Sequence, residues 1–160
     1  MMNGDMTARV DDSVLNLRVG AIITKGKRVL MVKNARDDWY YSVGGRIKVG
    51  ETSQQAVERE VFEELGVRLE IDRLGFVQEN YFYGTIGDSC ERLIYELCFY
   101  YYMKVPDGFE PACRSVAGDG AAETIEWVPF DTEETIYPVF FRTELEHPLP
   151  GIRHIVTDER

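Results

Sequence analysis

Cysteines and long apolar runs are scarce in this sequence. Its 160 residues hold three cysteines, Cys90, Cys98 and Cys113, which are too few and too widely spaced for a zinc site or a disulfide framework. Cys98 lies in an apolar run and is expected in the core, and the cysteine usage favours a reducing, cytoplasmic setting. No run of about 18 apolar residues occurs, so we expect no membrane span. Residues 1–12 have no apolar stretch of the kind that a secretory signal needs.

Positive charge is also in deficit. Lys and Arg number 18 against 28 Asp and Glu, which gives a formal net charge of −10. Proteins bind nucleic acid through an excess of Lys and Arg, so we expect no nucleic-acid partner. An acidic protein that acts on a phosphate compound must place a cation between itself and that anion. The charge balance therefore implies a metal ion if the substrate is phosphorylated.

The remaining composition is that of one globular domain. Hydrophobic residues make up 44% of the chain and charged residues 29%, which is enough apolar material for a core. No internal repeat, low-complexity stretch or linker divides the sequence. We therefore expect a single domain over residues 1–160, in which 1–12 form a loose N-terminal tail or part of an edge strand.

Hydrophobic periodicity predicts several strands and two helices. Strands are predicted at 14–24, 28–33, 39–43, 67–82, 93–103, 124–128 and 152–157. Helices are predicted at 52–65 and 132–145, although Pro138 must sit near the start of the second helix or break it. Strands on both sides of a central helix, followed by a second helix, predict an α/β fold, a sandwich built on a mixed β-sheet.

The helix at 52–65 has clear start and stop signals. Thr52 and Gln55 form a capping box at its start, and Gly66 supplies the left-handed residue that ends it. An apolar stripe along the helix must face the core. That stripe consists of Val57, Val61 and Leu65.

A second stripe on this helix is acidic. Glu60, Glu63 and Glu64 stand at positions i, i+3 and i+4, so they share one side of the helix. At about 100° per residue, Glu64 lies only about 20° from Val57, at the edge of the buried face. Like charges at these spacings destabilise a helix by about 0.2–0.5 kcal/mol per pair, whereas Mg²⁺ requires clustered oxygen ligands. The stripe is therefore either a metal site or a solvated acidic face.

The residues around this helix resemble the Nudix box. From Gly45 the chain reads Gly45, five residues, Glu51, seven residues, and then Arg-Glu-Val-Phe-Glu-Glu-Leu-Gly-Val over 59–67. This is similar to the pattern G-x5-E-x7-R-E-U-x-E-E-x-G-U, in which U is aliphatic, at every specified position. Such a match arises by chance in roughly one in ten million chains of this length. It favours a metal site over a solvated acidic face.

The resemblance implies a ligand set for Mg²⁺ or Mn²⁺. Glu60 and Glu64 are implied as direct ligands, and Glu63 as a further ligand or catalytic partner. The carbonyl of Gly44 is implied as another ligand, at the start of the helix. Arg59 resembles the family's structural arginine, which orients a glutamate through a charge-assisted hydrogen bond.

The resemblance also implies a reaction, in which metal-activated water cleaves a diphosphate bond in a nucleoside diphosphate linked to another moiety X. The general base is not fixed by position in the family. Glu96 is the best candidate outside the box, because its strand at 93–103 is apolar on both faces and a lone carboxylate there must be paired, protonated or metal-bound. A structural pair with an arginine is the alternative for Glu96. Glu79 and Glu110 are weaker candidates for the base.

Substrate selectivity is expected from aromatic and basic residues outside the helix. Trp39 and Tyr81 are expected to stack on a base, with core packing as the alternative for such aromatic residues. Arg46, together with Lys33 and Arg36, is expected to meet phosphates. The implied partner is thus a small-molecule nucleoside diphosphate derivative.

Two rival functions stay open at this point. One is a non-catalytic Nudix-fold module that senses a nucleotide, and such modules usually lack box glutamates that are present here. The other is an isomerase that acts on a diphosphate ester without cleaving it. A homodimer is compatible with each of these functions.

Overall fold

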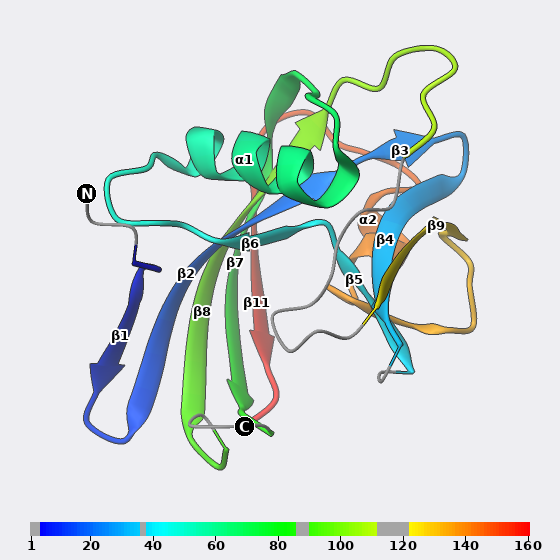
Figure 1. The fold of residues 1–160 in the computed structure, drawn as a ribbon. Coiled ribbons are helices and arrows are strands. Elements are labelled where there is room, and N and C mark those ends of the chain that lie inside the picture. The colour runs from blue at the N-terminus through cyan, green and yellow to red at the C-terminus, as the bar shows by residue number, and fades with distance from the viewer. Residues whose placement is uncertain (1–3, 36–37, 86–89, 112–121) are drawn as a thin grey trace.

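The computed structural model describes residues 4–35, 38–85, 90–111 and 122–160. Within these ranges the chain forms two β-sheets and two helices (Figure 1). No helix in these ranges is long and apolar enough to cross a membrane. Of the residues singled out from the sequence, Arg36 and Cys113 lie outside the described residues.

The larger sheet has six strands in the order β1-β2-β8-β7-β11, with β6 also paired to β2. Its strands are β1 (Thr7–Val10), β2 (Ser13–Ile22), β6 (Gly44–Arg46), β7 (Ile71–Tyr83), β8 (Leu93–Met103) and β11 (Arg153–Asp158). The β2–β8 and β7–β11 pairs are parallel, whereas β1–β2, β2–β6 and β7–β8 are antiparallel. The predicted mixed sheet is thus confirmed.

The smaller sheet has five strands in the order β10-β5-β4-β3, with β9 also paired to β4. Its strands are β3 (Thr24–Lys25), β4 (Arg28–Asn34), β5 (Trp39–Ser42), β9 (Glu123–Pro129) and β10 (Thr135–Tyr137). Gly26, with a φ of 61°, turns the chain between β3 and β4, a conformation that glycine adopts without steric cost. The β5–β10 pair is parallel, so this sheet is mixed as well.

Helix α1 spans Ser53–Leu65, within one residue of the predicted helix. The Thr52 side chain accepts a hydrogen bond from the backbone N–H of Gln55, and the Gln55 side chain accepts one from the backbone N–H of Thr52. Gly66 ends the helix at a φ of 69°. The buried side chains of α1 are Ala56, Val57, Val61 and Leu65. The capping signals and the apolar stripe are therefore confirmed.

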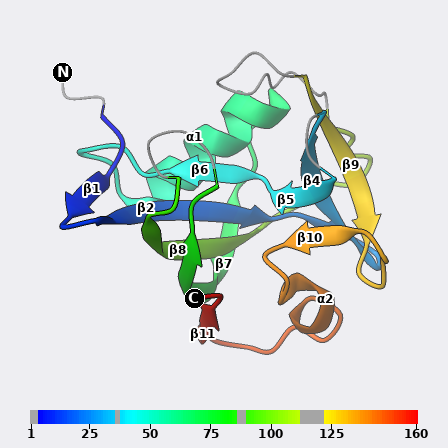
Figure 2. The same cartoon turned by 90° about the horizontal axis from the view of Figure 1, so that it is seen from below.

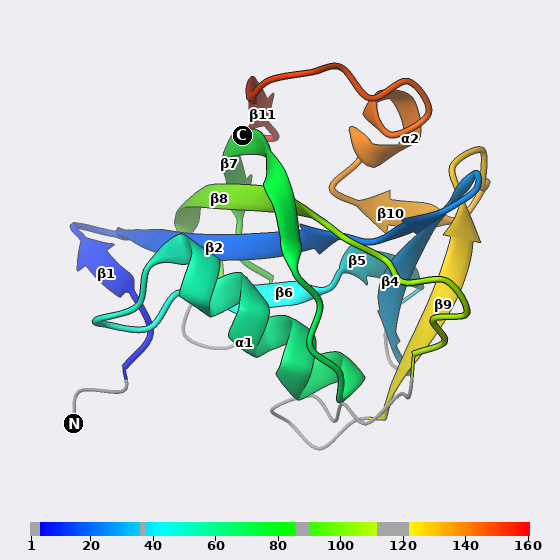
Figure 3. The same ribbon diagram turned by 90° about the horizontal axis from the view of Figure 1, so that it is seen from above.

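Strand β2 separates two layers of apolar side chains, because successive residues of a strand point to opposite faces. Val19 and Ala21 join the core beneath α1, whereas Ile22 joins a second core that contains Phe141. Phe141 begins the short helix α2 (Phe141–Glu144). Figure 3 shows α1 and α2 on opposite sides of the larger sheet. The α/β/α layering is therefore confirmed, with a second helix of only one turn.

Both ends of the described chain pair with the larger sheet. After α2, the chain runs along the side of the sheet away from α1 and ends as β11 beside β7 (Figure 2). The predicted strand at 152–157 is thus confirmed. Residues 7–10 pair with β2 as β1, so this part of the N-terminal segment is an edge strand and not a loose tail.

The predicted helix at 132–145 is wrong over most of its length. Residues 135–137 form β10, and only 141–144 are helical. Pro138 has no N–H to donate and keeps its preceding residue out of the helical region. Thr135 and Ile136 favour a strand, because their branched β-carbons fit an extended backbone.

The predicted strand at 67–82 is confirmed as β7 over most of its length, but its start is wrong, because β7 begins only at Ile71. Leu69 is buried in the core beneath α1, and Val67 packs against the same core. The alternation of apolar residues in this segment therefore reflects the burial of a connection between α1 and β7, not a hydrogen-bonded ladder.

Phe141 is fully buried in the second core and contacts the rings of Tyr100 and Phe140. Its removal should therefore lower the stability of the fold. We expect Phe141→Ala to lower the free energy of unfolding by roughly 3–5 kcal/mol in urea denaturation. Phe62→Ala is the matched control, because Phe62 is exposed on α1 and its loss should cost less than about 1 kcal/mol. Equal losses in the two variants would contradict the packing of α2 described above.

Candidate functional site

Arg59, on α1, is bonded to three carboxylates. Its Nε and Nη2 donate to Glu51 at 2.7 and 2.9 Å, a bidentate pair that fixes both side chains. Its Nη1 donates to Glu60 at 2.6 Å and to Glu63 at 3.1 Å, and its Nη2 reaches the Arg46 carbonyl at 3.0 Å. The bonds to Glu51, and then those to Glu60, raise the pKa of Arg59 above its usual value. Arg59 therefore fastens several acids at once.

Glu51 ties the loop before α1 to the helix. Its Oε2 accepts the backbone N–H of Lys48 at 3.0 Å, while both of its oxygens accept from Arg59. The Arg59 bonds lower the pKa of Glu51, because they favour the charged form of the carboxylate. The charged pair thus holds the loop that delivers β6 to the side of α1.

Glu64 lies at the seam between α1 and β6. Its Oε1 accepts the backbone N–H of Gly44 at 3.3 Å, whereas its Oε2 is buried without a hydrogen-bond partner among the described residues. Burial raises the pKa of Glu64 to about 8, and the charges of Glu60 and Glu123 act in the same direction. A buried carboxylate with an unpaired oxygen is costly, and a bound cation would remove that cost.

Glu60 lies against the backbone of β6. A Cβ on Gly45 would stand 2.5 Å from Glu60 Oε1, so only glycine lets the carboxylate approach so closely. The Glu60 side chain is 14% exposed, and burial raises its pKa against the lowering effect of Arg59. Glu63, at the outer edge of the stripe, is 50% exposed and lies 3.9 Å from Lys48 Nζ.

These glutamates fit a hard divalent cation by their chemistry. Mg²⁺ takes carboxylate oxygens and retains several waters, and the unpaired oxygen of Glu64 beside Glu60 is a donor of this type. Within the described part of the chain, no three His, Cys, Asp or Glu side chains are gathered tightly enough to hold an ion. Arg59 and Lys48 instead bind Glu60 and Glu63. A cation would therefore compete with Arg59 for Glu60.

A pocket of about 800 Å³ lies on the face of the larger sheet away from α1. Arg18 and Glu96 line it, with Arg18 Nη1 3.4 Å from Glu96 Oε2. Asn16 Nδ2 donates to the same oxygen at 3.5 Å. Glu96 therefore has the arginine partner that was the alternative to a base, and its role as the base stays a prediction.

The residues expected to bind substrate are not all brought together. Trp39 lines this pocket, but Tyr81 does not. The Tyr81 ring instead packs against Tyr95 at 4.7 Å between centroids, and the guanidinium of Arg160 lies 4.5 Å from its centre. Arg46 is ion-paired with an aspartate near the N-terminus at 3.4 Å. The roles expected of Tyr81 and Arg46 stay predictions without a contact to the pocket.

The weaker base candidates are engaged elsewhere. Glu79 lies 2.8 Å from His154 Nε2 and accepts from the hydroxyl of Tyr95 at 3.1 Å. Glu110 pairs with Lys25 at 2.9 Å on the surface. These contacts are structural pairs, and neither glutamate lines the pocket.

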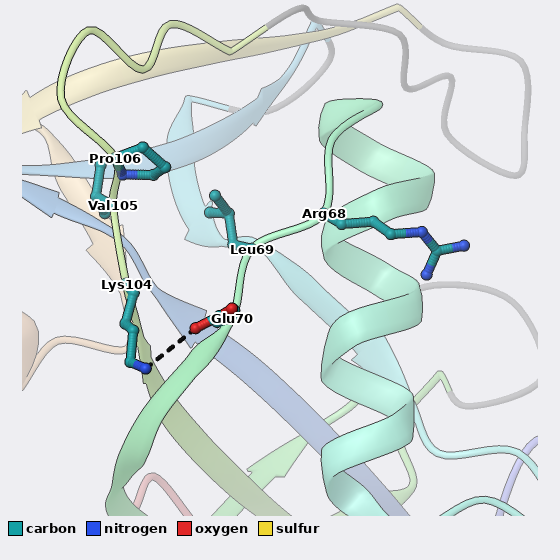
Figure 4. Close-up of a pocket in the computed structure, with 6 residues that line it drawn as sticks. All are labelled: Arg68, Leu69, Glu70, Lys104, Val105 and Pro106. Atoms are coloured by element: carbon teal, nitrogen blue, oxygen red, sulfur yellow. Dashed lines mark hydrogen bonds and ion pairs between the residues drawn. The ribbon is translucent and has the colours of Figure 1, made fainter.

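A second hollow, of about 320 Å³, lies between the segment that connects α1 to β7 and the residues that follow β8 (Figure 4). The ion pair between Lys104 and Glu70, at 3.1 Å, stands at one side of it. Arg68 extends away from this pair in Figure 4. No residue of the acidic stripe lines this hollow, so we do not assign it to the site.

Sequence reasoning missed several residues of the pocket. Gln78 and Asn80 line it from β7, and Tyr137 lines it from β10. Arg18 lines it from β2. Their one common signal is alternation along a strand, which shows that they share a face but not that this face is hollow.

A family model of the Nudix domain matches residues 14–143 of this chain. The chain belongs to the Nudix hydrolase family. A MutT-like protein of Streptomyces ambofaciens is 33% identical to this Nudix chain over 68 residues, which are 42% of this chain and 44% of that protein. The match thus spans less than half of that relative.

Solved structures share the fold of this Nudix chain. An ADP-ribose pyrophosphatase of Streptococcus suis superposes with a TM-score of 0.57 at 16% identity, over 87% of this chain and 98% of that one. A UDP-X diphosphatase superposes with a TM-score of 0.61 at 14% identity, over 92% and 68% of the two chains. At these identities the likeness shows a common fold.

The hydrogen bonds of Arg59 to three glutamates should stabilise the folded chain, so removal of the guanidinium should lower its stability. We expect Arg59→Met to lower the free energy of unfolding by about 2 kcal/mol, because Glu51 and Glu60 are left partly buried without their partner. Urea denaturation measures this loss. Arg68→Met is the matched control: Arg68 is exposed and rests on the Phe62 ring, and its loss should cost less than about 1 kcal/mol. A negligible effect of Arg59→Met would rule out its structural role.

Proposed function

We propose that this Nudix protein is a divalent-metal-dependent hydrolase that cleaves a diphosphate bond in a nucleoside diphosphate linked to a second moiety X. One observation carries the proposal: a buried oxygen of Glu64 has no hydrogen-bond partner among the residues that the structure describes, and it lies beside Glu60 within a complete Nudix box. Selection for stability alone would replace such a carboxylate, because burying it unpaired costs free energy. The names of the ADP-ribose pyrophosphatase and the UDP-X diphosphatase support a diphosphate bond as the one cleaved.

Mg²⁺ or Mn²⁺ held by Glu60 and Glu64 would neutralise the diphosphate oxygens and make a water more acidic. The chain's own residues position these ligands. Arg59 and Glu51 fix the helix against its loop, and the Gly44 N–H orients Glu64. Gly45 leaves the space that the Glu60 carboxylate occupies.

The reaction consumes one water and gives two phosphate products. The water oxygen bonds to one phosphorus, and the bond from that phosphorus to the bridging oxygen breaks. The bridging oxygen leaves with the other phosphate, and a proton of the water passes to a carboxylate acting as general base. Glu63, half exposed beside Glu60, and Glu96, in the pocket, are the two candidates for this base that we propose.

We expect Glu64→Gln to lower kcat by more than about 100-fold, because a direct ligand matters more than a supporting residue, whose loss costs 10–100-fold. The free energy of unfolding should stay the same or rise, because glutamine, unlike the buried carboxyl, cannot ionise. Glu58→Gln is the matched control, since Glu58 is exposed on the same helix and its change should leave both quantities unaltered. The rate of product formation is measured in the presence of Mg²⁺ or Mn²⁺. The substrates are ADP-ribose, UDP-sugars, nucleoside triphosphates and dinucleoside polyphosphates.

The same substrate panel decides between this proposal and its rivals. Cleavage of at least one compound, lost in Glu64→Gln, supports the hydrolase. Full activity in Glu64→Gln contradicts the assignment of Glu64 as a ligand. Binding without cleavage of any compound would leave the nucleotide-sensing module, and conversion to an isomeric diphosphate ester would leave the isomerase.

The contact between β6 and α1 predicts that Gly45→Ala weakens metal binding with little effect on the fold. The added methyl meets the flexible end of Glu60 at 2.5 Å, so the carboxylate moves and the backbone does not. We expect Mn²⁺ affinity, measured by titration calorimetry, to fall by more than about tenfold. Gly4→Ala is the control, because a Cβ there meets nothing within 4 Å. Unchanged Mn²⁺ affinity in Gly45→Ala would exclude Glu60 from the ligand set.

A further inference from the structure

The mouth of the 800 Å³ pocket carries two exposed aromatic rings. Trp39 and Tyr137 are 40% and 42% exposed, and their ring centroids lie 6.4 Å apart at an angle of 87°. They come from β5 and β10, whose parallel pairing sets Thr135 opposite Trp39 and Tyr137 opposite Tyr41. Large aromatic surfaces left in water beside a hollow favour a planar ligand that can stack on them.

The floor of the pocket carries two carboxamides on the same face of β7. Gln78 is 4% exposed; its Oε1 accepts from the Tyr100 hydroxyl at 3.2 Å, and its Nε2 donates to Thr157 at 2.7 Å. These two bonds fix the amide and leave it one further donor and one further acceptor site. Asn80, two residues along, has a side chain with no hydrogen bond to any other residue that the structure describes. The floor can therefore pair with a ligand edge that has both donors and acceptors.

The charges of the pocket limit how many phosphates an occupant can carry there. Among the described residues that line it, Arg18 is the one basic residue, and Glu96 and Glu159 are acidic. A ligand with many phosphates would meet more negative than positive charge in this pocket. A neutral ring that carries one phosphate chain, directed toward Arg18, fits this balance.

Arg18 lines this pocket from β2, the strand that also pairs with β6 beside the acidic stripe. The next two residues of β2, Val19 and Gly20, pair with Gly45 and Gly44 of β6, and the Gly44 N–H bonds Glu64. The Arg18 side chain is 35% exposed, and its 3.4 Å contact to Glu96 is a single long one. The guanidinium thus keeps donors available for an anion, because it carries five.

We propose that this pocket is the base-reading half of the substrate site: a nucleobase stacks on Trp39 and Tyr137, the amides of Asn80 and Gln78 hydrogen-bond its polar edge, and Arg18 receives the adjoining phosphate. The inference rests on the proposed function, because it takes the cleaved compound to be a nucleoside diphosphate derivative. It assigns base selectivity to the face of the sheet opposite α1.

The test is metal-free binding, since it requires neither a cation nor turnover. AMP, GMP, CMP and UMP are titrated in EDTA against the full chain by calorimetry, with ribose 5-phosphate as the probe that lacks a base. At least one nucleotide is expected to bind at least about tenfold more tightly than ribose 5-phosphate, since stacking one base on an aromatic side chain has this magnitude. Equal binding of ribose 5-phosphate and all four nucleotides would overturn the proposal.

Three variants separate the parts of the pocket. Trp39→Ala should weaken the preferred nucleotide by about tenfold and leave ribose 5-phosphate unchanged. Asn80→Ala should reduce the difference in affinity among the four nucleotides, because it removes a hydrogen-bonding group that reads the base. Arg18→Met should weaken nucleotides and ribose 5-phosphate alike by about tenfold. Nucleotide binding that Trp39→Ala and Asn80→Ala leave unchanged would place the base elsewhere.

Two control variants carry the same chemical changes away from the pocket. Phe62→Ala and Gln54→Ala remove an exposed aromatic ring and an exposed amide from α1, and both should bind nucleotide as the wild type does. Base-selective binding without hydrolysis by the wild type would overturn the hydrolase and leave the base-reading pocket in place. Hydrolysis without base-selective binding would overturn the pocket assignment alone.

Discussion

Repulsion among glutamates is the constraint on which the rest of this site depends. Four glutamates, one in the loop before α1 and three along the helix, lie near one another, and the Arg59 guanidinium forms hydrogen bonds with three of them, Glu51, Glu60 and Glu63. Glu51 belongs to the loop before α1. The Arg59 charge that reduces repulsion among the helix glutamates therefore also holds this loop, and with it β6, beside the helix. Glu64 is the carboxylate that this arrangement leaves out. Its unpaired oxygen is a destabilising feature of the chain on its own and a useful one for a chain that binds a cation.

Strand β2 contacts both the core beneath α1 and the pocket, and so fixes their relative positions. One of its faces supplies Val19 to the core beneath α1, and the other presents Arg18 to the pocket. A single strand with the usual alternation of side chains therefore has the acidic helix on one side and the pocket on the other. Gly44 and Gly45 of β6 allow this strand to pack closely between β2 and the Glu60 carboxylate. A side chain at Gly44 would collide with β2, and one at Gly45 would collide with Glu60.

Local patterns made α1 predictable, whereas distant pairings hid the pocket. The capping box, the apolar stripe and Gly66 lie within one segment, so periodicity located the helix to within one residue. The partner of Glu96 depends on the parallel pairing of β2 with β8, which brings Arg18 and Glu96 together across 78 positions. Tyr81 and Asn80 are neighbours in β7 that point to opposite faces, and no local pattern says which face is hollow. Pro138 indicated that the predicted second helix could be broken. It could not indicate the strand β10, which forms by pairing with the distant strand β5.

The acidic helix and the pocket also differ in the sequence separation of the residues that form them. This difference predicts the order in which the two parts form. The box occupies 23 consecutive residues, so its helix and loop can meet early, at little cost in chain entropy. The pocket is closed by pairs such as Gln78 with Thr157, 79 residues apart, and Trp39 with Tyr137. Those contacts must wait until β10 and β11 dock. We therefore expect the acidic helix to form before the pocket closes, so that the proposed recognition of the base would be the last property that the folding chain acquires.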